Sequence, residues 1–191
     1  MFYKIAWHIL KAYFFIFFRL KINGRENVGE TGGLIFCSNH SSMMDPTILS
    51  QLTKRRLCFL AKKELFGNRF VAAFLRGLGA YPVDRENADM AAFKQTLDYL
   101  ENGRIVCVFA EGSRFKELDL KNAKSGVALF ALKSGAEVLP IAIKTTYKLF
   151  SKITVDIGKP VDLTEYRGKK IKTELLNEIT EKIMTEVGGM I

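Results

Sequence analysis

Strand-like and helix-like segments alternate along nearly the whole chain, and this alternation constrains the fold more than any other feature of the sequence. Six short, mostly apolar runs are predicted to be strands: residues 33–39, 56–62, 79–85, 104–112, 137–144 and 152–158. Five segments are predicted to be helices: residues 46–53, 64–78, 88–102, 122–133 and 163–187. Because alternating strands and helices form layered α/β folds, we predict a mainly parallel or mixed central sheet flanked by helices.

The chain is predicted to form one main domain. Its 191 residues are enough to bury a substantial core. No internal repeat, low-complexity stretch or linker divides the sequence. We therefore predict an N-terminal helix over residues 1–22, followed by a single folded domain over residues 23–191.

The N-terminal segment MFYKIAWHILKAYFFIFFRLK is unusually apolar and aromatic. Its cations interrupt the apolar run, which argues against a cleaved secretory signal and against a membrane span of about 20 apolar residues. Lys4, His8 and Lys11 recur at helical spacing. We predict a helix in the membrane interface, with its aromatic side in the lipid and its cations toward the headgroups. The alternative is a helix that packs against the protein's own core.

The overall charge indicates an anionic partner. The chain carries 29 Lys and Arg against 20 Asp and Glu, a formal charge of +9. A phosphate ligand, an acidic protein, a nucleic acid or a membrane surface would each fit this charge. Cys37, Cys58 and Cys107 lie in apolar runs without C-x-x-C spacing, so they are predicted to be buried thiols in a reducing compartment.

Polar clusters follow three of the predicted strands, where ligands of such sheets usually bind. His40 and Asp45 follow the first strand, Arg85 the third, and Glu111-Gly112-Ser113-Arg114 the fourth. Brought together, they would provide a base, an acid that orients it and two arginines that clamp a phosphate. The alternatives are structural. Asp45 before Pro46 is typical of a helix N-cap, and the charged residues could pair with one another on a solvated rim.

Four of these stretches, in order, carry a resemblance to a known family. NHSSMMD, GAYPVDR, FAEGSR and VLPIAI resemble the four motif blocks of the glycerolipid acyltransferases, and are most similar to the 1-acyl-sn-glycerol-3-phosphate acyltransferase family. ITVDIGKPVDLTEY resembles the end of that family's domain, so the likeness covers most of the chain. The resemblance implies a glycerol-3-phosphate acyltransferase-like α/β fold, with residues 23–191 as the acyltransferase domain.

The resemblance implies that an acyl group moves from acyl-CoA or acyl carrier protein to lysophosphatidic acid, giving phosphatidic acid at the cytoplasmic face of a membrane. Another lysolipid or glycerol 3-phosphate is the alternative acceptor. His40 would act as the base, with Asp45 holding its imidazole. Pro140 falls in the block placed near the acyl donor. The residues that match the acceptor-binding blocks are Arg85, Glu111, Gly112, Ser113 and Arg114. The family needs no metal or cofactor.

Three positions depart from the family's pattern: Ala110 stands for proline, Ser113 for threonine, and Phe115 for a small polar residue. A nucleophilic serine is the competing mechanism, but no G-x-S-x-G elbow occurs. A non-catalytic, basic membrane-binding module is the alternative outside the enzymes. Nucleic acid is disfavoured because the aromatic residues lie in apolar runs: Phe66, Phe70 and Phe74 are predicted to form a core-facing side of a helix.

Overall fold

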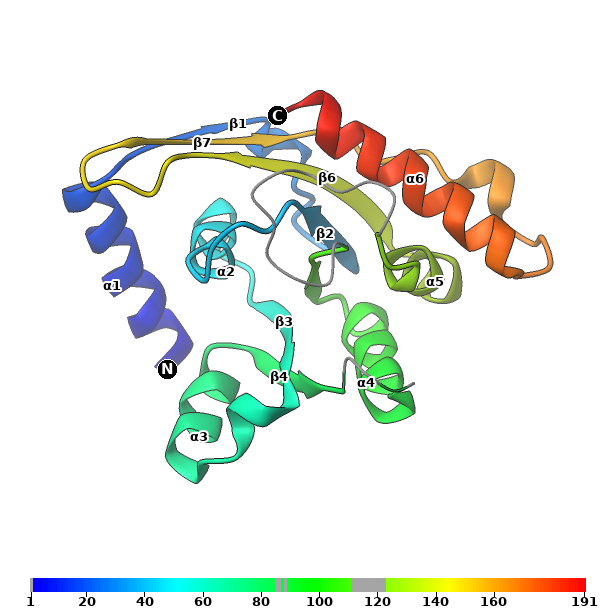
Figure 1. The fold of residues 1–191 in the computed structure, drawn as a ribbon, viewed down its shortest axis with the longest axis horizontal. Helices are drawn as coiled ribbons and strands as arrows, with labels where there is room; N and C mark the ends of the chain where they lie inside the picture. The colour runs from blue at the N-terminus through cyan, green and yellow to red at the C-terminus, as the bar shows by residue number, and fades with distance from the viewer. Residues whose placement is uncertain (1, 85–86, 88, 111–122) are drawn as a thin grey trace.

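The computed structural model describes residues 2–84, 87, 89–110 and 123–191. Their seven strands form one sheet in the order β1-β7-β6-β2-β5-β3-β4 (Figure 1). The strands are β1 (Arg19–Asn23), β2 (Leu34–Ser38), β3 (Leu57–Lys62), β4 (Ala80–Val83), β5 (Ile105–Val108), β6 (Glu137–Lys144) and β7 (Lys152–Ile157). Strands β6 and β7 pair antiparallel, and the other described pairs are parallel, which confirms the predicted mixed α/β sheet.

Helices cover both faces of the sheet. The α-helices are α1 (Phe2–Phe17), α2 (Asp45–Leu49), α3 (Arg69–Gly77), α4 (Met90–Glu101), α5 (Gly126–Ser134) and α6 (Thr173–Gly189). Four 3-10 helices are η1 (Arg25–Asn27), η2 (Ser50–Leu52), η3 (Lys63–Phe66) and η4 (Thr164–Tyr166). Helices α1 and α2 lie on one side of the sheet, and α4, α5 and α6 on the other (Figure 1).

The central strand β2 shows how the sequence produces two cores. All five of its residues are buried. Leu34 and Phe36 face the cluster that includes α1 and α2, whereas Ile35 and Cys37 face the cluster that includes α4, α5 and α6. Successive side chains of a strand point to opposite faces, so a continuous apolar run suits a strand that is covered on both sides. The end of β2 therefore lies at the centre of a well-packed sheet.

Each of the six predicted strands contains an observed strand, but β1 was missed. Its sequence, Arg-Leu-Lys-Ile-Asn, is short and polar because it forms the edge of the sheet, where it pairs only with β7 among the described strands. The predicted helix over residues 1–22 is correspondingly too long. The helix ends at Phe17, and the following residues belong to the sheet.

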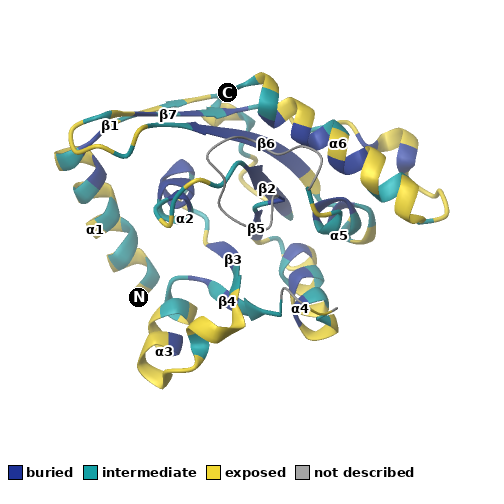
Figure 2. Ribbon diagram, viewed as in Figure 1, coloured by how far each residue is buried: buried dark blue, intermediate teal, exposed yellow. Residues whose placement is uncertain are grey.

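The orientation predicted for the N-terminal helix is wrong. The aromatic side of α1 packs against the protein: Phe14 is 1% exposed, and the indole nitrogen of Trp7 donates to the backbone oxygen of Ser50 at 2.8 Å. The exposed side instead carries mainly aliphatic residues and cations, together with Phe2 and Phe15. Figure 2 shows the mixture of exposed and partly buried positions along this helix. Among the described residues, no helix has the length and apolarity needed to cross a membrane.

Candidate active site

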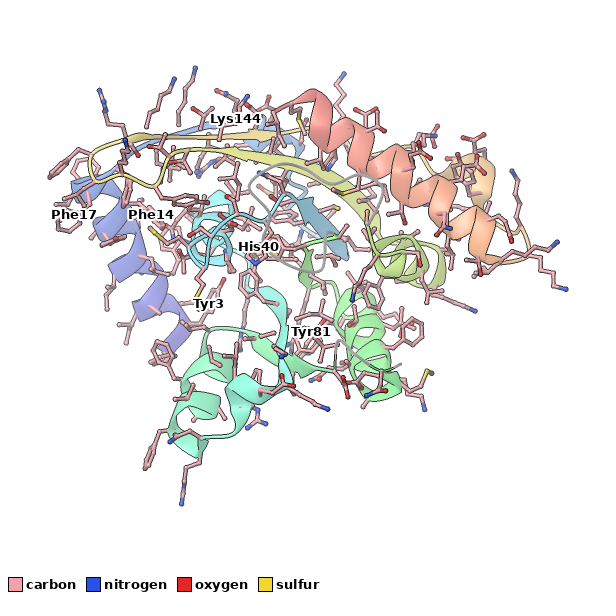
Figure 3. All side chains as sticks on the ribbon, in the orientation of Figure 1. Tyr3, Phe14, Phe17, His40, Tyr81 and Lys144 are labelled. Atoms are coloured by element: carbon pink, nitrogen blue, oxygen red, sulfur yellow. The ribbon has the colours of Figure 1, made fainter. Side chains whose placement is uncertain are left out.

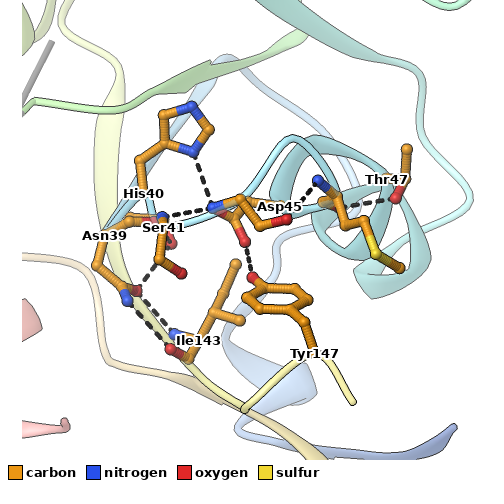
Figure 4. A network of polar contacts seen from close by, with 10 residues as sticks. Asn39, His40, Ser41, Asp45, Thr47, Ile143 and Tyr147 are labelled. Carbon is orange, nitrogen blue, oxygen red and sulfur yellow. Dashed lines mark hydrogen bonds and ion pairs between the residues drawn. The ribbon is translucent and has the colours of Figure 1, made fainter. Parts of the chain in front are cut away.

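The loop that follows β2 is fastened to β6 by a single side chain. The Asn39 amide nitrogen donates to the backbone oxygen of Ile143 at 3.0 Å, and its side-chain oxygen accepts from the Ile143 backbone nitrogen at 2.8 Å (Figure 4). The amide thus continues the pairing between the two strands one residue beyond β2. His40 follows immediately, so the position of its backbone is defined by the sheet.

Asp45 organises the rest of this loop. Its carboxylate is fully buried, and one oxygen accepts hydrogen bonds from the backbone nitrogens of Ser41 at 2.7 Å and Ser42 at 2.8 Å. The same oxygen lies 2.8 Å from Nδ1 of His40. The other oxygen accepts a hydrogen bond from the hydroxyl of Tyr147 (Figure 4). Three of these four partners, the two backbone N–H groups and the Tyr147 hydroxyl, donate to the carboxylate, which suits its ionised form.

The structural alternative, in which Asp45 serves as a helix N-cap, is wrong. Asp45 is the first residue of α2, and the position before it is Met44, whose side chain makes no capping bond. The Asp45 carboxylate turns back to the amides that precede it rather than forward to those of the helix. Pro46 stands in the first turn of α2. The carboxylate is therefore committed to the loop and to His40.

This geometry makes His40 a candidate general base. An ionised carboxylate can only accept, so Nδ1 of His40 carries the proton and Nε2 is left with a lone pair. Nε2 points away from Asp45 (Figure 4). The imidazole stacks on the ring of Phe109, the first residue after β5, with centroids 4.0 Å apart, and 12% of its side chain remains exposed. A buried carboxylate behind an accessible imidazole is the arrangement that removes a proton from a hydroxyl group.

An apolar cavity of about 460 Å³ adjoins His40. Figure 3 labels His40 and Tyr3, which both line it. The inner face of α1 contributes Trp7 and Leu10, and the region of α3 and β4 contributes Leu75, Leu78 and Ala80. Cavities of this size and apolarity hold small ligands or single hydrocarbon chains. The sequence did not reveal this cavity, because its walls come from segments that are far apart in the chain.

Five predicted site residues, Arg85, Glu111, Gly112, Ser113 and Arg114, lie outside the described residues, as does Phe115. The strands that precede these residues, β4 and β5, are described. β5 pairs parallel with β2 and with β3, and β3 pairs parallel with β4. β2, β4 and β5 therefore all end at the same edge of the sheet. Pro140 is buried within β6, opposite Cys37 of β2, and is not among the described residues that line the cavity.

Sequence reasoning missed Tyr147. It lies between β6 and β7, 102 positions from the carboxylate that it contacts, so no local spacing links the two residues. Its backbone has a φ angle of 56°, in the left-handed region that non-glycine residues seldom adopt. Such a conformation persists where surrounding contacts hold it, and the bond to Asp45 is one of these contacts. A tyrosine in a short turn carries no sequence signal for this role.

The cysteines do not contribute a nucleophile to this site. All three cysteines are buried, as predicted. Burial raises the pKa of the Cys58 and Cys107 thiols, which keeps them protonated and poorly nucleophilic. Among the described residues, no group of His, Cys, Asp and Glu side chains has the arrangement of a metal site.

Comparison with known proteins identifies the family to which the chain belongs. The family model described as Acyltransferase matches residues 19–144, which include β1 to β6 and the His40–Asp45 loop. The chain belongs to this acyltransferase family, which confirms the family resemblance of its motif blocks.

The relatives are more specific than the family model. The chain is 32% identical over 179 residues to the 1-acyl-sn-glycerol-3-phosphate acyltransferase of Streptococcus pneumoniae, covering 86% of this chain and 66% of that protein. It is 29% identical over 187 residues to the enzyme of the same name from Bacillus subtilis, covering 95% and 92%. The chain thus spans just under two thirds of the pneumococcal relative but nearly all of the Bacillus one.

A solved structure shows the same fold. The crystal structure of the 1-acyl-sn-glycerophosphate (LPA) acyltransferase PlsC from Thermotoga maritima superposes with a TM-score of 0.72 at 27% sequence identity. The match covers 98% of this chain and 78% of that chain, so it includes α1 as well as the sheet.

Proposed function

We propose that this protein transfers a fatty acyl group from an acyl thioester to the free hydroxyl of lysophosphatidic acid, giving phosphatidic acid. The observation that carries the proposal is the His40–Asp45 pair, 2.8 Å apart, beside an apolar cavity. The names of the pneumococcal, Bacillus and Thermotoga relatives support the choice of acceptor. Acyl-CoA and acyl carrier protein are both candidate donors.

In the proposed mechanism the acceptor's own hydroxyl is the nucleophile. Nε2 of His40 takes the hydroxyl proton as the oxygen attacks the thioester carbonyl carbon. The carbon–sulfur bond then breaks, and the departing thiolate receives the proton from the imidazolium. Asp45 stabilises the imidazolium through the bond to Nδ1 and does not itself take up the proton. No covalent bond to the enzyme forms, and no metal or cofactor takes part.

The acceptor phosphate is assigned to Arg85 and Arg114, with Glu111, Gly112 and Ser113 completing the binding segment. This assignment rests on the motif resemblance. Arginine suits the role because its planar guanidinium binds phosphate oxygens through two parallel hydrogen bonds.

A thiol-release assay tests the function. Purified protein is given acyl-CoA or acyl carrier protein donors with lysophosphatidic acid, glycerol 3-phosphate or monoacylglycerol as acceptor. Thiol release with lysophosphatidic acid, and much less with the acceptor that lacks phosphate, is expected. Greater thiol release with glycerol 3-phosphate would show that glycerol 3-phosphate, and not lysophosphatidic acid, is the acceptor. No thiol release with any donor and acceptor would overturn the enzyme proposal in favour of a basic membrane-binding module.

We assign the cavity to the donor's acyl chain, because His40, which lines it, must meet the thioester carbonyl while the hydrocarbon needs apolar walls. Ala80 of β4 lines the part formed with α3, two strands beyond β5 in the sheet. Ala80→Leu is expected to reduce turnover of long-chain donors by about tenfold, since excluding even one methylene costs about 1–3 kcal/mol. Short-chain donors should react normally.

The measurement for Ala80→Leu is kcat/KM over a series of donor chain lengths, and then over a series of acceptor chain lengths. Ala91→Leu, an exposed position on α4, provides the control. If the variant discriminates among acceptors instead of donors, the cavity holds the acceptor's chain and the assignment is wrong.

Tyr147 is expected to position Asp45. Tyr147→Phe removes one donor from the buried carboxylate while Ser41, Ser42 and His40 continue to hold the other oxygen. We expect kcat to fall about tenfold, because a hydrogen bond to a charged group contributes about 1.5–3 kcal/mol, while KM stays unchanged. The values of kcat and KM in the thiol-release assay measure this effect.

The control for Tyr147→Phe is Tyr99→Phe, which removes a hydroxyl that bonds Gln95 on α4, away from the loop. A variant with wild-type kcat and KM, even with reduced stability, would show that Tyr147 has a structural role only.

We further propose that the protein works at the cytoplasmic face of a membrane, as a peripheral or monotopic protein, with α1 against the lipid. The support is the outer side of α1: Ile5, Ile9 and Ile16 are 51%, 64% and 59% exposed, and the exposed cations Lys4 and Lys11 lie beside them. An apolar strip next to cations fits an anionic leaflet.

A further inference from the structure

We propose that the outer side of α3 is a second lipid-binding surface, which together with α1 places the two helical walls of the cavity against the membrane. Phe70, Phe74 and Val71 are 76%, 55% and 45% exposed. We call these three residues the α3 face. Figure 2 shows α3 as one of the most exposed helices of the molecule.

The sequence predicted the opposite for this helix. Phe70 and Phe74 were expected to face the core, but the buried residue of α3 is Ala72, and Leu75 lines the cavity. At about 100° per residue, Phe70 and Phe74 fall on the opposite side of the helix from Ala72, and Val71 lies between the phenylalanines and Leu75. Two phenylalanines exposed side by side are costly in water and indicate that something covers them.

The charge around the α3 face identifies its occupant as anionic lipid. Arg69 and Arg76 stand near the two ends of the helix, on the side away from Phe74, and the helix contains no acidic residue. The guanidinium of Arg69 lies over the Phe70 ring at 5.6 Å, which keeps a cation next to the exposed aromatic group. Aromatic side chains that enter the acyl boundary, with arginines at headgroup level, are the typical pattern of an interfacial helix.

The α3 face is continuous with the exposed side of α1. The rings of Phe2 and Phe74 meet edge to face with centroids 5.9 Å apart, and Phe2 is itself 47% exposed. The inner sides of the same two helices line the cavity through Trp7 and Leu10 on α1 and Leu75 on α3. A membrane that contacts both helices would therefore lie along the cavity walls, and an acyl chain would enter without crossing bulk water.

This inference rests on the proposed function only where it concerns the entry of an acyl chain. The experiment that tests it measures lipid binding directly. The variants are Phe70→Ser and the pair Phe70→Ser with Phe74→Ser. Phe70 makes its ring contact with Arg69 of the same helix, so the single variant should fold normally. Met90→Ser, at a position 59% exposed on α4, is the matched control.

Binding is measured by co-sedimentation with vesicles of phosphatidylglycerol and of phosphatidylcholine. We expect the single variant to bind phosphatidylglycerol vesicles about tenfold more weakly, and the double variant more weakly still, because each lost phenylalanine removes apolar area from the bilayer. Turnover of a soluble short-chain substrate pair should be unchanged, whereas turnover of substrates presented in vesicles should fall with binding.

Unchanged vesicle binding by the double variant would overturn the proposal. A wild-type protein that does not co-sediment with either kind of vesicle would overturn it as well. An Ile5→Ser, Ile9→Ser variant that loses binding while the Phe variants keep it would show that α1 acts alone. If the wild type self-associates without lipid and the Phe variants do not, the α3 face binds a second copy of the chain and the proposal fails. A failure of the proposed enzyme activity can be told apart from a failure of this proposal: the wild type would then release no thiol but would still co-sediment with vesicles.

Discussion

His40→Ala is expected to lower kcat by about 10²–10⁴-fold, the contribution that a positioned general base makes. The variant removes the side chain whose Nε2 faces away from Asp45 (Figure 4), and no second histidine is available in the loop. KM should change little, because the cavity walls and the acceptor-binding segment remain. The measurement is kcat in the thiol-release assay, with thermal unfolding followed by circular dichroism.

The fold should survive this substitution. Asp45 keeps its bonds from Ser41, Ser42 and Tyr147 after the imidazole is gone, so its buried charge is still stabilised. The chain supplies its own control in His8, the other histidine, whose Nδ1 lies 2.7 Å from the Lys4 backbone oxygen at an exposed position on α1. His8→Ala should retain full turnover in solution.

Near-normal kcat in His40→Ala would rule out the general-base mechanism. The serine alternative is tested beside it. Ser41 is exposed, and the bond that it contributes to Asp45 comes from its backbone nitrogen, which Ser41→Ala retains. Full activity of that variant is expected, and loss of activity as large as that of His40→Ala would point to a covalent serine route.

Asp45→Asn is expected to have the second-largest effect, because it damages both stability and turnover. Every partner of this carboxylate is a donor: two backbone N–H groups and the His40 ring on one oxygen, and the Tyr147 hydroxyl on the other. An amide has one accepting oxygen and one donating nitrogen, so one orientation sets its NH₂ group against the two backbone N–H groups. The other orientation turns the NH₂ group toward the Tyr147 hydroxyl, which must then accept, and its own hydrogen loses the carboxylate as a partner. The side chain is fully buried, so bulk solvent does not reach it.

Leaving a buried donor unsatisfied costs about 1–3 kcal/mol, and we expect Asp45→Asn to lower the free energy of unfolding by about this amount. Turnover should fall by roughly 10²–10⁴-fold, because an amide neither fixes the His40 tautomer nor stabilises the imidazolium. Urea unfolding measures the first effect and the thiol-release assay the second.

The control is Asp98→Asn, at an exposed position on α4 where the carboxylate accepts from Asn102. That variant should match the wild type in both measurements. A wild-type unfolding midpoint together with wild-type turnover in Asp45→Asn would contradict the proposed role of the carboxylate. Reduced stability with normal turnover would make Asp45 a structural residue only.

Much of the fold could be predicted because its strands are local patterns. The apolar runs that became β2, β5 and β6 are covered on both faces, and a run of that kind identifies a central strand without knowledge of its neighbours. β1 lacks the pattern because an edge strand needs only backbone pairing. Residues 64–78 were predicted to form one helix, but the structure divides them into η3 and α3. The division falls at Asn68, whose side chain accepts from the backbone nitrogens of Phe70 and Val71 and caps the start of α3.

The directions in which helices face were predicted less well. For α1 and α3 the residue spacing identified a helix, but α1 carries apolar residues on several sides, and the large apolar residues of α3 are divided between the cavity and the solvent. Periodicity then cannot tell which side meets the core. Packing decided it: the aromatic side of α1 closes the cavity, and the phenylalanines of α3 remain outside.

From its sequence alone this protein could be assigned an α/β architecture, a His40–Asp45 pair five positions apart and a family, because each depends on residues close together or on ordered motifs. The tertiary structure alone decided that Asp45 holds the loop instead of capping α2, that Tyr147 completes its shell of donors, and that α1 and α3 enclose an apolar cavity beside the imidazole. These features depend on contacts between distant segments, and such contacts exist only after the sheet has brought the segments together.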